Sequence, residues 1–182
     1  TFLFVGRIVR DKGINELVEA FNKLSQTVDA RLLLIGPYED TIDPISEHSR
    51  ELIEKNPTIE SLGAKYGEEL LSYYAASDCF VFPSYREGFP NTIVEAGAMN
   101  LPCIVTDING SREIIVDGEN GVIVPSQNID ALFDAMLNMV NNREERERMA
   151  SNARKMVADR YEQSFVRKCL YDFYDEILQN IS

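Results

Sequence analysis

The sequence has few of the residues from which metal centres and proton-transfer sites are built. It contains one histidine, His48, and three cysteines, Cys79, Cys103 and Cys169, with no Cys-x-x-Cys pair. A zinc site needs several His or Cys ligands, and a Ser-His-Asp triad needs a histidine beside its nucleophile, so we expect neither here. Widely spaced cysteines, two of them within apolar runs, favour a reducing cytoplasm over a disulfide-linked exterior.

Long apolar runs and excess positive charge are also absent. No stretch approaches the ~18 uninterrupted apolar residues of a membrane span, and the N-terminus lacks the layout of a signal peptide. The formal net charge is −12, from 30 acidic and 18 basic side chains. Such an acidic chain is not expected to bind nucleic acid, so any phosphate site must be local.

Three common motifs of nucleotide-binding proteins are absent as well. There is no Gly-x4-Gly-Lys-Ser/Thr loop and no Gly-x-Gly-x-x-Gly after the first apolar run, which argues against a P-loop nucleotidase or a dinucleotide dehydrogenase. No Asp-x-Asp pair of the kind that holds a divalent cation on a sugar diphosphate occurs. We therefore expect neither a metal nor an organic cofactor.

Short apolar runs alternate with segments of helical period along most of the chain. This order predicts an α/β fold, a doubly wound parallel sheet of the Rossmann type with extra C-terminal helices. The expected strands are Phe2–Val5, Leu32–Ile35, Ile59–Leu62, Cys79–Phe82, Cys103–Thr106 and Val122–Val124.

The helices between these strands are predicted from apolar residues recurring on one face. Asn128 is the expected N-cap of a helix after the last strand, and Asn100-Leu101-Pro102 is an expected helix stop. The faces expected to pack on the sheet are Ile14, Leu17, Val18, Phe21 and Leu24, then Leu70, Leu71, Tyr74 and Ala75, and last Leu132, Phe133, Met136, Leu137 and Val140.

From Arg143 to Ile181 the pattern remains helical without further strands. The charge run Arg143–Arg148 predicts a solvated helix face with mixed ion pairs. We expect one domain over residues 1–182, with an α/β core over 1–160 and a C-terminal helix over 161–182. Because the first strand begins almost at Thr1, we also expect a further domain upstream.

Two cations flank the loop after the first strand. Gly6-Arg7 follows that strand directly, and Lys12-Gly13 closes the loop at the start of the first helix. Ligands of open α/β sheets bind at the carboxyl edge of the strands, where both cations are expected. Arg7 and Lys12 therefore predict a local anion site, although a basic loop after a strand is by itself more often an ordinary surface feature.

A second cluster, Glu87–Glu95, follows the fourth strand. Gly88 and Pro90 suit a tight loop, and the next residues predict a helix whose free N–H groups, those of Asn91, Thr92 and Ile93, can face an anion. Glu87 stays in the loop, whereas Glu95 lies one turn into the helix. Carboxylates accept hydrogen bonds from hydroxyls, which a nucleotide sugar offers on its sugar and on its ribose. Alternatively, Glu95 only complements the helix N-terminus.

These motifs, taken in order, closely resemble the donor domain of family 4 retaining glycosyltransferases, which have the GT-B fold. The resemblance covers nearly the whole chain, and the Glu-x7-Glu spacing is its specific element. The residues that carry it are Gly6-Arg7, Lys12-Gly13, Pro83-Ser84, Glu87-Gly88-Phe89-Pro90, Glu95-Ala96, Asn109-Gly110-Ser111-Arg112-Glu113 and Asp117-Gly118-x-x-Gly121.

The resemblance implies a role for each motif. Arg7 and Lys12 would neutralise the donor diphosphate as the glycosidic bond breaks, with Gly6 beside them. Glu87 would hold hydroxyls of the donor sugar and Glu95 those of the ribose. The amides from Phe89 to Ile93, preceded by Gly88, would hold the phosphate and sugar. The base would lie against Gly63-Ala64-Lys65-Tyr66, so that Arg7, Lys12 and Glu87 form the catalytic set.

It also implies a metal-free transfer of a hexosyl-type sugar, from a UDP-sugar or alternatively a GDP-sugar, to a glycan or lipid-linked acceptor held by the upstream domain. That domain would make any membrane contact, at the inner face of the membrane, and the C-terminal helix would cross back toward it. Pro90, where others have a second glycine, suggests bacterial capsular or surface polysaccharide synthesis. Asn109-Gly110, in place of Gly-Gly, puts close backbone approach there in doubt.

Other functions compete with this interpretation. A sugar-nucleotide epimerase of GT-B architecture would need its own acid-base residues, and no histidine is placed for that role. A non-catalytic sugar-nucleotide-binding domain would have no need of both cations and both glutamates. A response-regulator-like receiver needs acidic residues after the first strand, where Gly6-Arg7 stands instead.

Overall fold

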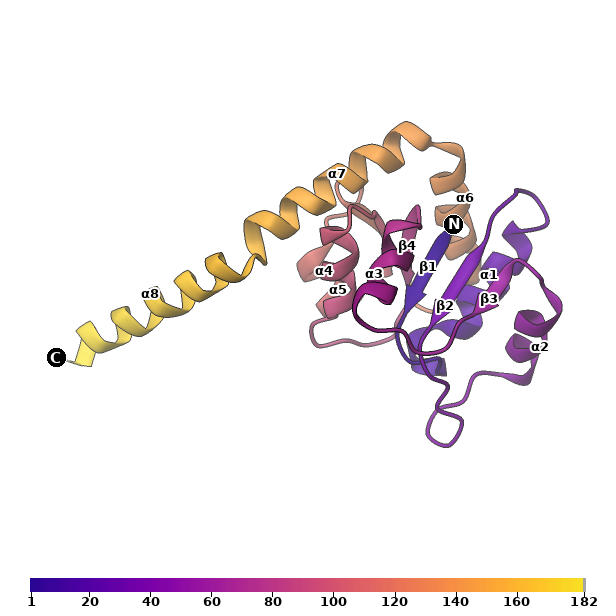
Figure 1. Ribbon diagram of the computed structural model, residues 1–182, viewed down its shortest axis with the longest axis horizontal. Helices are drawn as coiled ribbons and strands as arrows, with labels where there is room; N and C mark the ends of the chain where they lie inside the picture. The colour runs from indigo at the N-terminus through magenta and orange to yellow at the C-terminus, as the bar shows by residue number, and fades with distance from the viewer. Residues whose placement is uncertain (182) are drawn as a thin grey trace.

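A computed structural model describes residues 1–181 of the chain, and Ser182 of the predicted C-terminal helix lies outside this range. Six parallel strands form one sheet in the order β3-β2-β1-β4-β5-β6, with helices on both faces (Figure 1). The predicted fold class is confirmed. The strands are β1 (Phe2–Val5), β2 (Leu32–Ile35), β3 (Ile59–Ser61), β4 (Cys79–Phe82), β5 (Cys103–Thr106) and β6 (Gly121–Val124).

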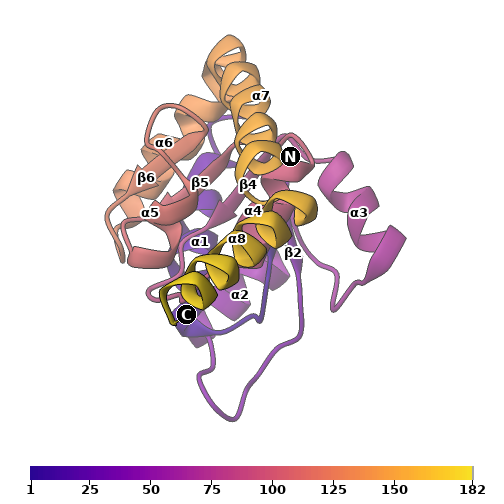
Figure 2. The same cartoon turned by 90° about the vertical axis from the view of Figure 1, so that its left-hand side faces the viewer.

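The helices form two layers. On one face α1 (Ile14–Leu24), entered through the short 3-10 helix η1 (Arg10–Lys12), packs against α2 (Glu47–Lys55) and α6 (Ile129–Asn141). On the other face α4 (Asn91–Ala98) packs against α5 (Asn109–Ile114) and α7 (Arg143–Arg160). Figure 2 shows α4 between α5 and α3 (Gly67–Ala75).

Most predicted packing faces are confirmed. All five apolar residues predicted to line α1 are fully buried in the core, where this helix packs beside α6. The prediction for α3 is wrong in part: Tyr74 is buried and Leu70 partly so, but Leu71 is 48% exposed and Ala75 is exposed. Only one narrow side of this short helix meets the core.

Local signals predicted several element ends. Asn128 caps α6, since its side chain accepts a hydrogen bond of 2.9 Å from the N–H of Ala131. The predicted stop after α4 is confirmed: Asn100 takes a left-handed φ of 63° two residues beyond the helix. The strand predictions were off by one residue at two ends, because β3 ends at Ser61 and β6 begins at Gly121.

The C-terminal segment is helical as predicted, in two pieces. Helix α7 buries Met149, Ala150 and Ala153, whereas α8 (Gln163–Ile181) extends away from the body with its side chains exposed over residues 163–179 (Figure 1). The charge run at the start of α7 includes the predicted surface ion pairs, such as Arg143–Glu147 at 2.7 Å. Within residues 1–181, no helix is long and apolar enough to cross a membrane.

Candidate functional site

The carboxyl edge of the sheet brings the two predicted clusters together. Strands β1 and β4 are neighbours, so the loop after each opens on the same side. Gly13 has a left-handed φ of 71°, and a Cβ there would lie 2.1 Å from the carbonyl oxygen of Pro83. Only glycine fits this contact, which holds the start of α1 against the end of β4. Tyr85 adds a backbone hydrogen bond of 2.8 Å to the carbonyl of Asp11.

Lys12 and Glu87, 75 positions apart in the sequence, form an ion pair across this contact. Lys12 donates through Nζ to Oε1 of Glu87, and each side chain is only 14% exposed. The hydroxyl of Ser84 donates to the same Oε1 at 2.8 Å, and Lys12 Nζ lies 5.7 Å from the centre of the Phe82 ring. Partial burial and three polar groups in contact hold both charges in one place.

Arg7 is also paired with a carboxylate. Its Nη1 donates to Oε2 of Glu39 at 2.7 Å, with the two side chains 47% and 30% exposed. Glu39 lies in the loop after β2, which approaches the loop after β1 where Gly6 donates to the Ile35 carbonyl at 2.9 Å. Both predicted cations are therefore charge-compensated in this structure. No sequence motif pointed to Glu39.

The N-terminus of α4 offers two amides rather than three. The N–H groups of Asn91 and Thr92 have no acceptor within the described part of the chain, as expected for a first helical turn. The N–H of Ile93 instead donates to the Pro90 carbonyl at 3.1 Å. The prediction that Ile93 has a free amide is thus corrected, because the chain tightens into a turn where the helix begins.

Glu95 is exposed on α4 and receives a hydrogen bond from a buried residue. The hydroxyl of Tyr74 on α3 donates to Oε2 of Glu95 at 3.1 Å. Burial, and then the neighbouring Glu95 carboxylate, raise the pKa of Tyr74 well above its usual value. The phenol therefore stays protonated and remains a donor. Helical periodicity had marked Tyr74 only as a core residue.

The backbone at Gly110 closely approaches the loop that contains Gly88, although Asn109 stands where related sequences have a glycine. A Cβ on Gly110 would lie 2.6 Å from the Gly88 carbonyl oxygen and 3.1 Å from Cβ of Glu87. The start of α5 therefore packs directly on the loop that carries Glu87. Asn109 accepts a hydrogen bond of 2.5 Å from Arg112.

The predicted base segment follows β3, two strands away from β1. Gly63 is anchored by its carbonyl, which accepts a hydrogen bond of 3.0 Å from the N–H of Gly36. Ala64 is exposed, Lys65 pairs with Glu69 at 2.6 Å, and Tyr66 precedes α3 with 78% of its surface exposed. The segment thus lies at the carboxyl edge, without direct contact to Lys12 or Arg7 among the described interactions.

Phe89, in the loop before α4, contacts the junction between α7 and α8. Its ring meets that of Tyr161 edge to face, with centroids 5.6 Å apart. The Tyr161 hydroxyl donates to the Glu113 carbonyl at 3.1 Å. Sequence patterns gave no sign of this contact, because it joins segments 72 positions apart along the chain.

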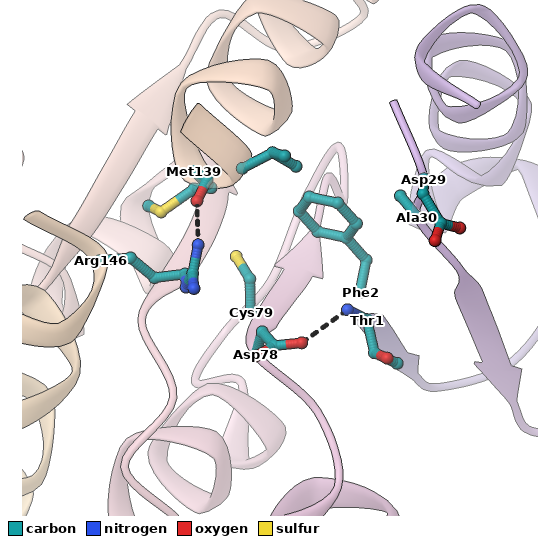
Figure 3. A pocket seen from close by; sticks show the side chains of 9 residues that line it. Thr1, Phe2, Asp29, Ala30, Asp78, Cys79, Met139 and Arg146 are labelled. Atoms are coloured by element: carbon teal, nitrogen blue, oxygen red, sulfur yellow. Dashed lines mark hydrogen bonds and ion pairs between the residues drawn. The ribbon is translucent and has the colours of Figure 1, made fainter. Parts of the chain in front are cut away.

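Two cavities lie at opposite edges of the sheet. The one at the carboxyl edge has a volume of about 630 Å³, contains Arg7 and extends to Arg86 and Tyr85. The other, about 200 Å³, lies at the amino ends of β1 and β4 and is lined by Phe2, Cys79 and Arg146 among others (Figure 3). None of the predicted site residues lines this second cavity, and a ligand site there would contradict the carboxyl-edge rule.

A sequence profile identifies the family. The profile described as "Glycosyl transferases group 1" matches residues 1–156. The chain belongs to this family. The profile match confirms the resemblance drawn from the motifs. The six-stranded sheet also matches the GT-B structures of other glycosyltransferases.

Individual glycosyltransferases similar to this group 1 chain are consistent with the family assignment. It is 33% identical to the capsular polysaccharide biosynthesis glycosyltransferase CapM of Staphylococcus aureus, over 97% of this chain and 46% of that protein. It is 34% identical to a GDP-mannose-dependent alpha-mannosyltransferase of Mycobacterium tuberculosis, over 86% of this chain and 38% of that protein. The crystal structure of Anabaena HepE in complex with UDP shares the fold, with a TM-score of 0.85, 18% identity and coverage of 96% and 48%.

The chain spans less than half the length of these relatives.

Proposed function

We propose that this domain binds the nucleotide-sugar donor of a retaining glycosyltransferase and stabilises the departing nucleoside diphosphate. The observation that supports this most directly is the grouping of Lys12, Glu87 and the free amides of α4 at one edge of the sheet, in a chain of the group 1 family. In this otherwise acidic protein, cations and free helix amides lie together where a diphosphate would bind.

In this proposal each group has a separate task. When the bond between the anomeric carbon and the diphosphate oxygen breaks, negative charge grows on the diphosphate. Arg7, Lys12 and the amides of Asn91 and Thr92 stabilise that charge, which lowers the barrier because they are already oriented. Glu87 accepts hydrogen bonds from the sugar hydroxyls and Glu95 from the ribose. No metal ion is required, and the sugar keeps its anomeric configuration.

The relatives support the donor class and suggest the acceptor. HepE was crystallised with UDP, and the mycobacterial relative depends on GDP-mannose. UDP is our first choice of nucleotide and GDP the second. CapM takes part in capsular polysaccharide biosynthesis, which supports a bacterial glycan or lipid-linked acceptor. We place the intact enzyme in the cytoplasm, with any membrane contact made by the acceptor domain.

Calorimetric titration of this chain with UDP, GDP, ADP and their sugars, in EDTA, tests the proposal. We expect one of the uridine or guanosine ligands to bind without added metal and to weaken as salt rises, because exposed charges are screened. A strict magnesium requirement, or no binding by any member of the panel, would contradict the proposal.

The chain on its own is expected to transfer no sugar. Alignment of donor and acceptor is a large part of catalysis, and the acceptor side is assigned here to a separate domain. Transfer to any acceptor by this chain alone would refute the two-domain assignment. Epimerisation of the bound sugar nucleotide would favour the epimerase alternative, and binding without turnover in the intact protein would favour a non-catalytic domain.

A further inference from the structure

Tyr74 links the core of the domain to a predicted ligand-binding carboxylate. Its ring is fully buried and packs against Phe80 of β4, with centroids 5.9 Å apart. Phe80 stacks on Phe82 at 5.9 Å, and Phe82 stacks on Phe4 of β1 at 5.7 Å. The phenol therefore packs against a row of aromatic rings that runs along β4 and onto the neighbouring β1, and close packing fixes its position.

The hydroxyl is the one part of the Tyr74 side chain that makes a polar contact. It donates to Oε2 of Glu95, whose side chain is exposed on the first turns of α4. An exposed glutamate normally samples several rotamers, and a buried donor selects the one that reaches it. Within residues 1–181 the structure gives the Glu95 side chain no other hydrogen bond, so its second carboxylate oxygen remains available to a ligand.

We propose that Tyr74 is a positioning residue, which holds Glu95 in the rotamer that accepts hydrogen bonds from the ribose hydroxyls of the bound nucleotide. This inference rests on the proposed function, which assigns Glu95 to the ribose. Tyr74 itself does not touch the ligand. It reduces the conformational entropy that Glu95 loses on binding, and the effect is confined to ligands that carry ribose hydroxyls.

Helix α3 also connects the predicted base segment to Tyr74. The helix begins directly after Tyr66, at the end of the predicted base segment, and carries Tyr74 two turns later. Its two ends thus approach the base and the ribose of the same nucleoside. Because Tyr74 anchors α3 to β4 through Phe80, the spacing between the two subsites is set by the core of the domain.

Tyr74→Phe isolates the hydroxyl, because it keeps the buried ring. The probes are UDP or GDP, whichever binds the parent chain more tightly, and its 2′,3′-dideoxy analogue. We expect Tyr74→Phe to weaken the ribonucleotide about three- to tenfold and the dideoxy analogue hardly at all. Tyr73→Phe is the matched control, since that hydroxyl on the same helix makes no hydrogen bond in the described structure. It should change neither affinity.

Glu95→Ala separates failure of this inference from failure of the proposed function. If Glu95→Ala leaves the preference for ribose over dideoxyribose unchanged, the ribose assignment of Glu95 is wrong. If Glu95→Ala abolishes the preference but Tyr74→Phe keeps it at the parent value, Glu95 binds ribose without help and the positioning role is refuted. A lower melting temperature for Tyr74→Phe with an unchanged preference also refutes it, because the hydroxyl then serves only the fold.

Discussion

Lys12 and Glu87 neutralise each other inside the candidate site, each with 14% of its side chain exposed. A bound nucleotide sugar would bring a diphosphate to Lys12 and hydroxyls to Glu87, so donor binding would exchange one set of partners for another. Ser84 donates to the same carboxylate oxygen at 2.8 Å, so both charges are oriented by side chains of the domain itself.

Glu87→Gln is expected to reduce the difference in affinity between the nucleotide sugar and the free nucleoside diphosphate. Removing the carboxylate charge releases Lys12, so the free nucleoside diphosphate should bind about two- to tenfold more tightly. The nucleotide sugar should lose the additional affinity that its sugar provides in the parent. Calorimetry with both ligands measures the ratio, and Glu51→Gln, which breaks the surface pair with Lys55, is the control. Equal changes for both ligands would contradict the assignment of Glu87 to the sugar.

Arg7 and Glu39 give a second test of competition for a cation. Arg7→Ala should weaken the nucleoside diphosphate about tenfold or more, the loss expected for a hydrogen bond to a charged group. Glu39→Gln should strengthen it only about two- to fivefold, because the pair is partly solvated and worth little. The gain from Glu39→Gln should vanish when Arg7 is also replaced. If it persists in the double variant, Glu39 acts by another route.

Helix α8 should contribute almost nothing to the stability of this chain. Its described side chains are exposed over residues 163–179, so a chain ending at Tyr161 should melt within about 2 °C of the parent. A chain ending at Asn142 should be much less stable, because Met149, Ala150 and Ala153 of α7 are buried. Thermal denaturation followed by circular dichroism distinguishes the two. A large loss on removing α8 alone would show that it packs on the body.

Buried thiols should make the fold less stable in alkali. Burial raises the pKa of Cys79 to about 12, from 9.0, and also raises that of Cys103. Above pH 9 the unfolded chain loses these protons while the folded chain keeps them, so the free energy of unfolding falls as pH rises. The slope is at most about 1.4 kcal/mol per pH unit for each thiol. Urea denaturation from pH 7 to 10.5 measures it, and Cys79→Ala should reduce the slope.

The sequence by itself determined the features that depend on local pattern. Short runs of branched and aromatic side chains predicted the positions of all six strands. The buried face of α1 and the Asn128 cap were predictable because each depends on residues within one or two helical turns of each other. The two site clusters were also predictable, because each directly follows a strand and parallel strands share one carboxyl edge.

The tertiary structure decided which partners meet at that edge. Lys12–Glu87, Arg7–Glu39 and Tyr74–Glu95 join residues 75, 32 and 21 positions apart, and strand order and helix packing bring them into contact. The same holds for errors: Leu71 is exposed because α3 meets the core on one narrow side, and the Ile93 amide is taken by a turn at Pro90. Side-chain charge and the spacing of apolar residues can be read from the sequence, but contacts between distant segments form only when the sheet brings those segments together.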